Sequence, residues 1–314
     1  MPDLISIGEC MIELFSEEPM ESAGVFQRSL AGDSFNILVA AGRLGTSTGY
    51  ITLLGDDPFQ TYLRNSFTNE GIDISQIKTV SGFNAAHFVA TKDDGDREFV
   101  YYRSGSAPTY LTPDHIDEKY LSSAKILHCS GIAQAISDSS RKTVLEAAKR
   151  ANEQNITVSY DPNYRHQLWN FEAAREAMEE LLPFVDIFMP SMPADSEALF
   201  GTNDTDRIIS ESTDRGIKIV VVKKGHLGSS VYHDGNRIDL DPYQTKQVID
   251  TTGAGDAFNG AFLHGIMTGM SHYESACLAN ISAGMNITGR GALSGMAEGE
   301  VIYDLHKTYM EQMA

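Results

Sequence analysis

Residues 250–256 read Asp-Thr-Thr-Gly-Ala-Gly-Asp, and this run combines a turn that can bind an anion with a free carboxylate. Gly253 and Gly255 allow a tight turn in which consecutive backbone N–H groups point at one spot. Residues 257–266 are apolar enough for a buried helix, and the N-terminus of that helix would add positive potential. The run therefore predicts an anion-binding site.

Asp256 would stand at the mouth of the same helix, where a carboxylate is a poor choice for holding phosphate alone. It suits a reaction in which the carboxylate takes a proton from a hydroxyl while the turn stabilises charge on a phosphoryl group. This chemistry is that of a kinase. The simpler alternative is a glycine-rich turn capped by an acid. A dinucleotide-binding turn fits less well because Phe258 replaces its third glycine, and the sequence has no Walker A motif.

The composition is that of a globular protein without a membrane span. Of its 314 residues 42% are hydrophobic and 21% charged, which allows one large α/β domain or two smaller ones. No apolar stretch reaches the ~18 residues of a membrane-spanning helix, and the N-terminus lacks the basic start of a signal peptide. Scattered cysteines at 10, 129 and 277 favour reduced thiols in a cytoplasm. The net charge of −19 argues against binding to nucleic acid or an anionic membrane.

Strand-like and helix-like segments alternate along most of the chain, which predicts an α/β fold with a doubly wound, mostly parallel sheet flanked by helices. The expected strands are 4–8, 49–54, 126–129, 157–160, 187–189 and 219–222, with a hairpin over 228–233 and 237–241. The expected helices are 34–44, 58–70, 138–153, 171–181, 193–200, 204–215, 256–269, 272–287 and 298–312.

The alternation is interrupted by two short segments, 85–91 and 97–103, which Asp-Asp-Gly-Asp at 93–96 would join as a β-hairpin. A lone hairpin is only marginally stable, so we expect it to pair with extended segments between about 11 and 30. The expected division is an α/β nucleotide- and substrate-binding domain (1–10, 31–80 and 105–314) and a small β-sheet lid (about 11–30 and 81–104).

A polar run follows the strand expected at 157–160. Residues 160–165 read Tyr-Asp-Pro-Asn-Tyr-Arg, and ligand sites in open α/β sheets lie beyond the C-terminal ends of the strands. Packing does not explain Asp, Asn and Arg in such a row, so Arg165 is a candidate for holding an anion. Trp169, the only tryptophan, is better explained as core packing.

Tyr-Tyr-Arg at 101–103 lies in the expected hairpin, where strand alternation places Tyr101 and Arg103 on one face. Arg103 could reach from the small sheet toward a bound anion, and a sheet that covers the site would exclude water. The alternative is a cross-strand aromatic pair with a solvated arginine.

Residues 31–36 open a helix, and Gly32, Asp33 and Asn36 could present hydrogen-bond partners to sugar hydroxyls. A helix cap formed by Asp33 or Ser34 is the alternative explanation.

Residues 222–228 end a strand with two glycines three residues apart. Gly225 and Gly228 could let the backbone approach a nucleotide, with Lys223 near its phosphates. A β-turn before the next hairpin explains the same glycines.

Taken in order, residues 32–36, Arg165, the G-x-x-G at 225–228 and the run 250–256 resemble the ribokinase-like (PfkB) family of carbohydrate kinases over nearly the whole chain. The element at 253–256 is the most specific signature of that family. Within the family, three segments look like 2-keto-3-deoxygluconate kinases: 7–14 (Ile-Gly-Glu-Cys-Met-Ile-Glu-Leu), 101–103 and 161–169 (Asp-Pro-Asn-Tyr-Arg-His-Gln-Leu-Trp).

The resemblance implies transfer of the γ-phosphoryl group of Mg-ATP to the 6-hydroxyl of 2-dehydro-3-deoxy-D-gluconate. It makes Asp256 the catalytic base and the backbone amides of Gly253, Ala254 and Gly255 the anion hole. The residues that it implies for the sugar acid are Gly32, Asn36, Tyr101, Arg103 and Arg165. The residues that it implies along the nucleotide channel are Lys223, Gly225, Gly228 and Asn280.

Two arginines left unpaired by a neutral sugar would disfavour fructose or ribose, since a charge-assisted hydrogen bond contributes roughly 1.5–3 kcal/mol. The resemblance further implies a homo-oligomer, a dimer or higher. It leaves open a potassium requirement near Asp250 and residues 289–295.

The chain departs from the family pattern at two places. His87 stands where many relatives carry a tyrosine, so a packed or solvated histidine is the alternative to a substrate contact. The family's Asn-x-x-Glu near the magnesium region has no clean copy. Ser191 and Asp195 are the nearest candidates, offset by one residue, and the metal ligands stay unknown.

Other functions remain open on the sequence. A fructokinase or a 5-dehydro-2-deoxygluconate kinase would share the strand end at 161–165. A non-catalytic sugar-acid sensor is a remote alternative, because Asp256 and the glycines of the turn are intact.

Overall fold

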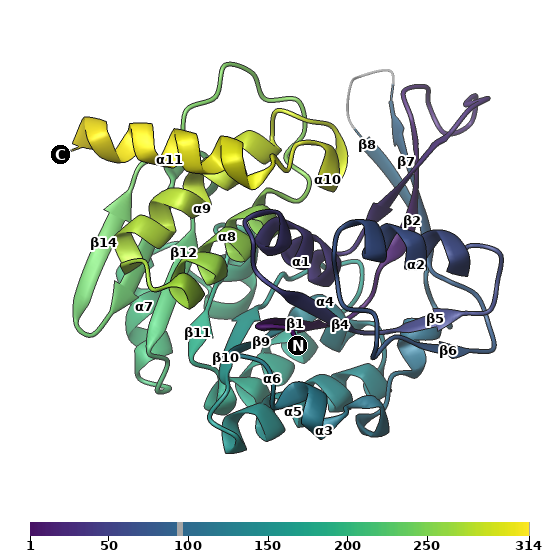
Figure 1. Cartoon of the computed structure of the whole chain (residues 1–314), viewed down its shortest axis with the longest axis horizontal. Coiled ribbons are helices and arrows are strands. Elements are labelled where there is room, and N and C mark those ends of the chain that lie inside the picture. Colours follow the sequence, from purple (N-terminus) through teal and green to yellow (C-terminus); the bar gives the residue numbers. More distant parts are fainter. Residues whose placement is uncertain (93–96, 314) are drawn as a thin grey trace.

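The computed structural model describes residues 1–92 and 97–313 and is built around one eight-stranded sheet (Figure 1). The strand order is β14-β13-β12-β11-β10-β9-β1-β4. The strands are β1 (Leu4–Ile7), β4 (Thr48–Ile51), β9 (Ile126–Ser130), β10 (Thr157–Asp161), β11 (Ile187–Phe188), β12 (Ile219–Lys223), β13 (Ser229–His233) and β14 (Asn236–Leu240). Neighbours from β12 to β4 pair in parallel, and β13 and β14 add an antiparallel edge. The doubly wound, mostly parallel sheet is confirmed.

Helices cover both faces of this sheet, as Figure 1 shows. On one side lie α1 (Asp33–Arg43), α8 (Ala254–Thr268), α9 (His272–Asn286) and α11 (Gly299–Met313). On the other lie α3 (Glu118–Leu121), α5 (Asp138–Glu153) and α6 (Phe171–Leu181). The alternation of a β-strand divides the apolar side chains between two cores. Leu4 packs with Phe262 in the first core, whereas Ile5 packs with Val144 in the second.

The remaining elements connect these layers. The other regular elements are α2 (Gln60–Asn69), α4 (Gly131–Ala135), α7 (Thr205–Thr213), α10 (Gly291–Ser294), β5 (Leu53–Gly55) and β6 (Lys78–Val80). Short 3₁₀ turns cover Ala107–Tyr110, Pro113–His115, Leu182–Phe184 and Gly225–Leu227. Over the helix predicted at 193–200, residues 194–200 are helical, and the last five of them, Ser196–Phe200, are π-helical. Pro193 offers no backbone N–H, and Gly201, at φ 64°, ends the turn after Phe200.

A separate four-stranded sheet has the order β3-β2-β7-β8 and stands at one end of the molecule (Figure 1). Its strands are β2 (Met11–Ser16), β3 (Gln27–Ala31), β7 (Ala86–Thr91) and β8 (Arg97–Tyr102). The expected hairpin is present as the antiparallel pair of β7 and β8, and it joins β2 as expected. The turn expected at 93–96 lies outside the described residues. The division into an α/β part and a lid is an interpretation that this separate sheet supports.

Helices α1 and α8 cross at very short range. A β-carbon on Gly260 would lie 2.6 Å from both the carbonyl oxygen of Ile37 and the β-carbon of Ala40. Only glycine allows this approach. The crossing brings Asn36, in the first turns of α1, against Asp256, in the first turn of α8.

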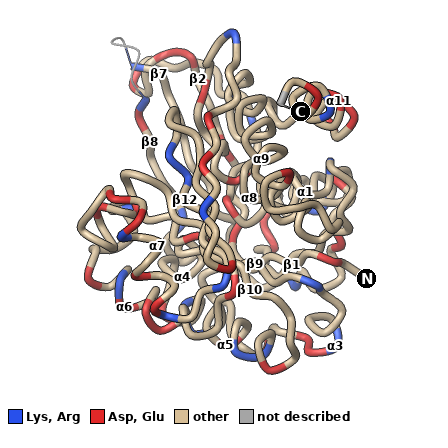
Figure 2. Tube along the Cα trace, turned by 90° about the vertical axis from the view of Figure 1, so that its left-hand side faces the viewer, with Lys and Arg blue, Asp and Glu red and all other residues tan. Residues whose placement is uncertain are grey.

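The charge distribution gives no sign of a polyanion-binding surface. Figure 2 shows acidic and basic residues interspersed along the described trace, without a run of basic residues. Within residues 1–92 and 97–313, no helix combines the length and apolar character needed to cross a bilayer.

Candidate active site

The run 250–256 forms the predicted turn and helix start. Gly253 is the N-cap of α8 with φ 79°, and a β-carbon there would lie 2.8 Å from the Cα of Ala292. Glycine is therefore required both by the backbone conformation and by the close packing. N–H groups in the first turn of a helix have no intrahelical partner, so this turn has the donors of an anion hole.

Asp256 lies in that first turn and is only 9% exposed. Its Oδ2 accepts a hydrogen bond from Asn36 Nδ2 at 2.7 Å. Burial, followed by the negative charges of Asp33 and Asp161, raises the pKa of Asp256 to about 7. A carboxyl with a pKa near the working pH is suited to general-base catalysis.

Asp33 faces the same space from α1. Its carboxylate accepts hydrogen bonds from the Ser34 amide (2.7 Å), from Asn163 Nδ2 (3.0 Å) and from Ser130 Oγ. Burial raises the pKa of this carboxyl as well. The N-cap of α1 is Gly32, which forms no side-chain cap bond. Asp33 thus binds α1 to the ends of two strands of the sheet, which a helix cap alone does not explain.

Three predicted sugar-acid residues meet where the small sheet faces the large one. Arg103 forms a buried ion pair with Glu9, and its guanidinium carbon lies 5.6 Å from the ring centroid of Tyr101. Burial and the neighbouring charge of Arg165 lower the pKa of Arg103 to about 10. The charge of Arg165 also acts on the hydroxyl of Tyr101, although burial still raises the pKa of that group.

The two arginines differ in whether their guanidinium group already has an acidic partner. Arg165 is exposed and donates to the backbone oxygen of Tyr164, and within the described part of the chain it has no ion pair. Arg103 is already paired with Glu9. The sequence argument counts two unpaired cations for a substrate carboxylate, but the structure leaves one.

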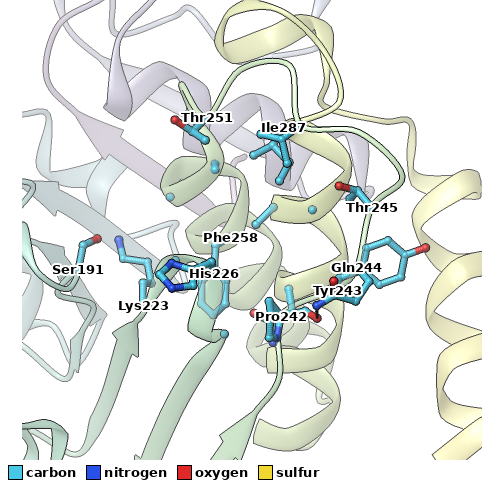
Figure 3. A pocket seen from close by; sticks show the side chains of 18 of the residues that line it. Ser191, Lys223, His226, Pro242, Tyr243, Gln244, Thr245, Thr251, Phe258 and Ile287 are labelled. Atoms are coloured by element: carbon cyan, nitrogen blue, oxygen red, sulfur yellow. Dashed lines mark hydrogen bonds between the residues drawn. The ribbon is translucent and has the colours of Figure 1, made fainter.

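A cavity of about 490 Å³ opens beside the turn, on the side away from the small sheet. Figure 3 shows Lys223 and Ser191 at one end and Tyr243 and Gln244 at the other. The lining is largely apolar, with Val248, Phe258, Ala283 and Ile287 among its members. A polar end and an apolar end suit a nucleotide, whose phosphates and base have these properties.

Lys223 lies between this cavity and the buried carboxyl of Asp256, on which its charge acts. Its Nζ donates to Asp161 in a buried ion pair, and a β-carbon on Gly255 would lie 3.7 Å from the same Nζ. The ammonium group therefore lies beside the anion-hole turn. Asn259 Nδ2 donates to Asp161 from the next turn of α8 at 2.6 Å.

The other residues predicted to bind the nucleotide, Gly225, Gly228 and Asn280, line the cavity. For Gly228 and Asn280, local packing or hydrogen bonding also explains why that residue type is present. Gly228 has φ 81°, and a β-carbon there would overlap the carbonyl oxygen of Leu240, so the hairpin itself requires glycine. Gly225 has φ 57° with open space around it. Asn280 donates to the Asp241 carbonyl at 3.1 Å, which fixes its side chain against the loop after β14.

A dedicated metal cage is absent from the part of the chain that the structure describes, where no three His, Cys, Asp or Glu side chains converge. Asp195 accepts hydrogen bonds from the amides of Tyr164 (2.7 Å) and Ser191 (2.6 Å), so it holds two loops together. Burial and the charge of Asp161 raise the pKa of Asp195 to about 6.

His87 is packed inside the small sheet. Its Nε2 lies 2.9 Å from Glu13 Oε2, and its ring meets that of Tyr101 edge-on at 5.3 Å. It therefore supports Tyr101 from behind.

Sequence reasoning did not single out the partners of these residues. Glu9 and Asp161 lie inside segments that the sequence analysis quoted without giving them a role, and Asn259 lies three residues beyond the run 250–256. Asn259 follows Asp256 by three residues, which places both on one face of the helix. This spacing could have identified Asn259 as a site residue from the sequence.

The fold, the cavity beside the turn and the buried carboxyl fit a phosphotransferase that acts on small molecules. A model of the pfkB family carbohydrate kinases matches residues 1–298, and the chain belongs to this family. It is therefore a sugar kinase.

The relatives include kinases that are named for two different keto-deoxy sugar acids. The chain is 30% identical to the 5-dehydro-2-deoxygluconokinase of Clostridium tetani, covering 99% of this chain and 94% of that protein. It is 30% identical to the 2-dehydro-3-deoxygluconokinase of Thermoproteus tenax, covering 93% and 90%. A crystal structure from E. coli, described as ribokinase II in complex with ATP and Mg²⁺, matches with a TM-score of 0.90 at 25% identity, covering 98% and 100%.

Proposed function

We propose that this sugar kinase phosphorylates 2-dehydro-3-deoxy-D-gluconate on its 6-hydroxyl, with ATP as the donor. The observation that carries the proposal is Arg165, which is exposed, has no ion pair among the described residues, and lies close enough for its charge to act on Tyr101 and Arg103. A sugar acid would place its carboxylate on the arginine and its far hydroxyl at the carboxyl group of Asp256. Charge-assisted pairing of this kind favours an acid over a neutral sugar.

Each proposed role follows from position. Asp256 takes the proton from the attacking hydroxyl, and the amides of Gly253, Ala254 and Gly255 stabilise the transferring phosphoryl group. Lys223 adds a positive charge at the same turn. The proposed sugar-binding residues are Gly32, Asp33, Asn36, Tyr101, Arg103 and Arg165. The proposed nucleotide-binding residues are Lys223, Gly225, Gly228 and Asn280.

Magnesium would arrive with the nucleotide. No convergent set of carboxylates is present among the described residues, and Mg²⁺ retains waters and binds phosphate oxygens readily. When bound, the ion neutralises charge on the phosphates. Asp195 and Ser191 lie at the phosphate end, where Asp195 keeps the loop in place through two backbone hydrogen bonds.

The small sheet is proposed to act as a lid over the sugar. Arg103 and Tyr101 lie on its inner face, and the Arg103–Glu9 ion pair links β8 to the end of β1. A homo-oligomeric, cytoplasmic enzyme completes the proposal, and light scattering after size-exclusion chromatography tests its assembly.

A second candidate is phosphorylation of 5-dehydro-2-deoxygluconate. It is favoured by the Clostridium tetani relative, which is as similar as the Thermoproteus protein and matches more of this chain. Both substrates are acids, so Arg165 does not separate them. A fructokinase is the alternative that acts on a neutral sugar. Because only one arginine is left for a substrate carboxylate, the argument against a neutral sugar is weaker than with two.

The test is ADP release with five acceptors side by side: 2-dehydro-3-deoxygluconate, 5-dehydro-2-deoxygluconate, gluconate, fructose and ribose. We expect kcat/KM for 2-dehydro-3-deoxygluconate to exceed that for fructose by about 10- to 100-fold, the equivalent of one charge-assisted hydrogen bond. Equal turnover of fructose would overturn the choice of an acid. A preference for 5-dehydro-2-deoxygluconate would establish the second candidate.

A further inference from the structure

A second cavity, of about 280 Å³, lies between the small sheet and the loop that leads into α10. Its wall includes five charged side chains, namely Glu13, Arg28, Arg97, Asp250 and Arg290. Asp250 and Thr252 belong to the run that contains the anion-hole turn. The cavity therefore connects the inner face of the small sheet with the back of that turn.

Arg97, the first residue of β8, forms an ion pair with Asp250. Its Nη1 donates to Asp250 Oδ1 at 2.6 Å and to Thr252 Oγ1 at 3.2 Å. The Asp250 side chain is 3% exposed, and its two oxygens also accept from the amides of Thr252 (3.0 Å) and Gly291 (2.6 Å). One buried carboxylate thus joins the small sheet, the turn and the start of α10.

Asp250 binds the amide of Gly291 at the start of α10, and the turn at Gly253 packs against this same segment. A β-carbon on Gly253 would lie 2.8 Å from both the Cα and the Cβ of Ala292, the residue after Gly291. A shift of this segment would therefore move Gly253 and the amides that follow it.

The buried charge of Asp250 needs a permanent counter-charge. Burial alone would raise the pKa of this carboxyl, but hydrogen bonds from Arg97 and from the amides of Thr252 and Gly291 lower it to about 2. An ionised carboxylate behind an anion hole would also repel a phosphoryl group unless a cation compensates it. Within the described residues, Arg97 is the one cationic side chain in an ion pair with Asp250.

We infer that Arg97 is a positioning residue that supplies, from the small sheet, the cation required at Asp250, and thereby holds the anion-hole turn in its working geometry. It follows that the reaction needs no free monovalent cation at this place. It also follows that the turn is fully supported only while the small sheet lies against the large domain. The inference rests on the proposed function, because its main readout is phosphoryl transfer.

The same face of the small sheet makes a second contact with this loop. A β-carbon on Gly291 would lie 3.3 Å from Glu13 Oε1, and Glu13 binds His87, whose ring supports Tyr101. Strand β8, which carries Tyr101 and Arg97, and strand β2, which carries Glu13 and is separated from β8 by β7, therefore both reach the segment behind the turn.

The test compares Arg97→Gln, which removes the charge, with Arg97→Lys, which keeps it. We expect Arg97→Gln to lower kcat at least 10-fold while KM for the sugar changes less than 3-fold, and Arg97→Lys to retain most of kcat. Wild-type activity should be equal in potassium, sodium and choline chloride at constant ionic strength. Potassium should restore part of the activity of Arg97→Gln.

Glu17→Gln is the matched control, because it breaks an ion pair between the residue after β2 and the residue before α10, Glu17 with Arg290, without touching Asp250. Equal losses in Arg97→Gln and Glu17→Gln would show that general docking of the sheet is responsible, and would overturn the inference. A wild-type requirement for potassium would overturn it too.

Thermal unfolding without any sugar separates this inference from the proposed function. Potassium should raise the Tm of Arg97→Gln more than choline does at equal ionic strength, and should show no such preference with the wild-type protein. The absence of a potassium preference in the variant counts against the inference. Failure of the proposed function would instead appear as no ADP release by wild-type protein with any acceptor.

Discussion

Replacing Asp256 by Asn should abolish most activity and at the same time stabilise the fold. The base would be lost, so kcat should fall by about 10²- to 10⁴-fold while nucleotide binding persists. The stability gain comes from the burial of the carboxylate, because burial is the main cause of its raised pKa. An amide of the same shape can still meet Asn36 without carrying a charge.

The magnitude follows from the shift of the pKa from 3.8 to about 7. Because the folded pKa lies above the unfolded one, the folded protein binds the proton more tightly, and stability falls as the pH rises from about 4 to about 7. At about 1.4 kcal/mol per unit, the ionised carboxylate costs up to ~4 kcal/mol at pH 8 and ~2 kcal/mol at pH 5. Asp256→Asn should remove this cost.

Urea unfolding of both proteins at pH 8 and pH 5 measures the effect. The free energy of unfolding of Asp256→Asn should exceed that of the wild type by up to ~4 kcal/mol at pH 8 and by about half as much at pH 5. Glu300→Gln neutralises an exposed carboxylate on α11 and serves as the control. A variant that is no more stable than wild type at pH 8, or whose gain does not shrink at pH 5, would refute the reasoning.

Three further changes probe the remaining parts of the site. Arg165→Ala should raise KM for a sugar acid about 10- to 100-fold and leave turnover of a neutral sugar unchanged, as steady-state kinetics on both acceptors would show. Gly253→Ala must adopt φ 79° and displace Ala292, so kcat should fall more than 10-fold and the Tm should drop with a loss of ~1–3 kcal/mol. Lys223→Met leaves the buried Asp161 without its cationic partner, which should cost ~3–5 kcal/mol in urea unfolding at pH 8 and lower kcat.

Helices whose first turn is capped by a neighbouring side chain could be predicted from the sequence with accurate starting residues. Helices α5 and α6 begin where expected because Ser137 and Asn170 accept hydrogen bonds from the amides of Ser140 and Ala173. The segment at 193–200 has no such cap, and its first residue is a proline. Short helices such as α4 depend on the loops around them and carry no periodic pattern long enough to detect.

The site could be predicted only where one short segment carries both its geometry and its chemistry. The run 250–256 contains the turn, the helix start and the carboxylate, so its local structure follows from its sequence. The pairs Glu9–Arg103 and Arg97–Asp250 join residues far apart in the chain, and they depend on how the small sheet lies on the large domain. Strand alternation gave the face of Arg103 but could not give its partner.

The close crossing of α1 and α8 means that Gly260, a residue outside the proposed site, sets the position of the proposed base Asp256 relative to Asn36. Gly260 has no side chain, and for that reason Asn36 and Asp256 lie 2.7 Å apart although 220 positions separate them in the chain. A single methyl group at Gly260 would force the two helices apart and move the side-chain amide of Asn36 away from the carboxyl of Asp256. Attempts to redesign acceptor choice in this scaffold should therefore leave that helix crossing untouched and vary the strand-borne side chains instead.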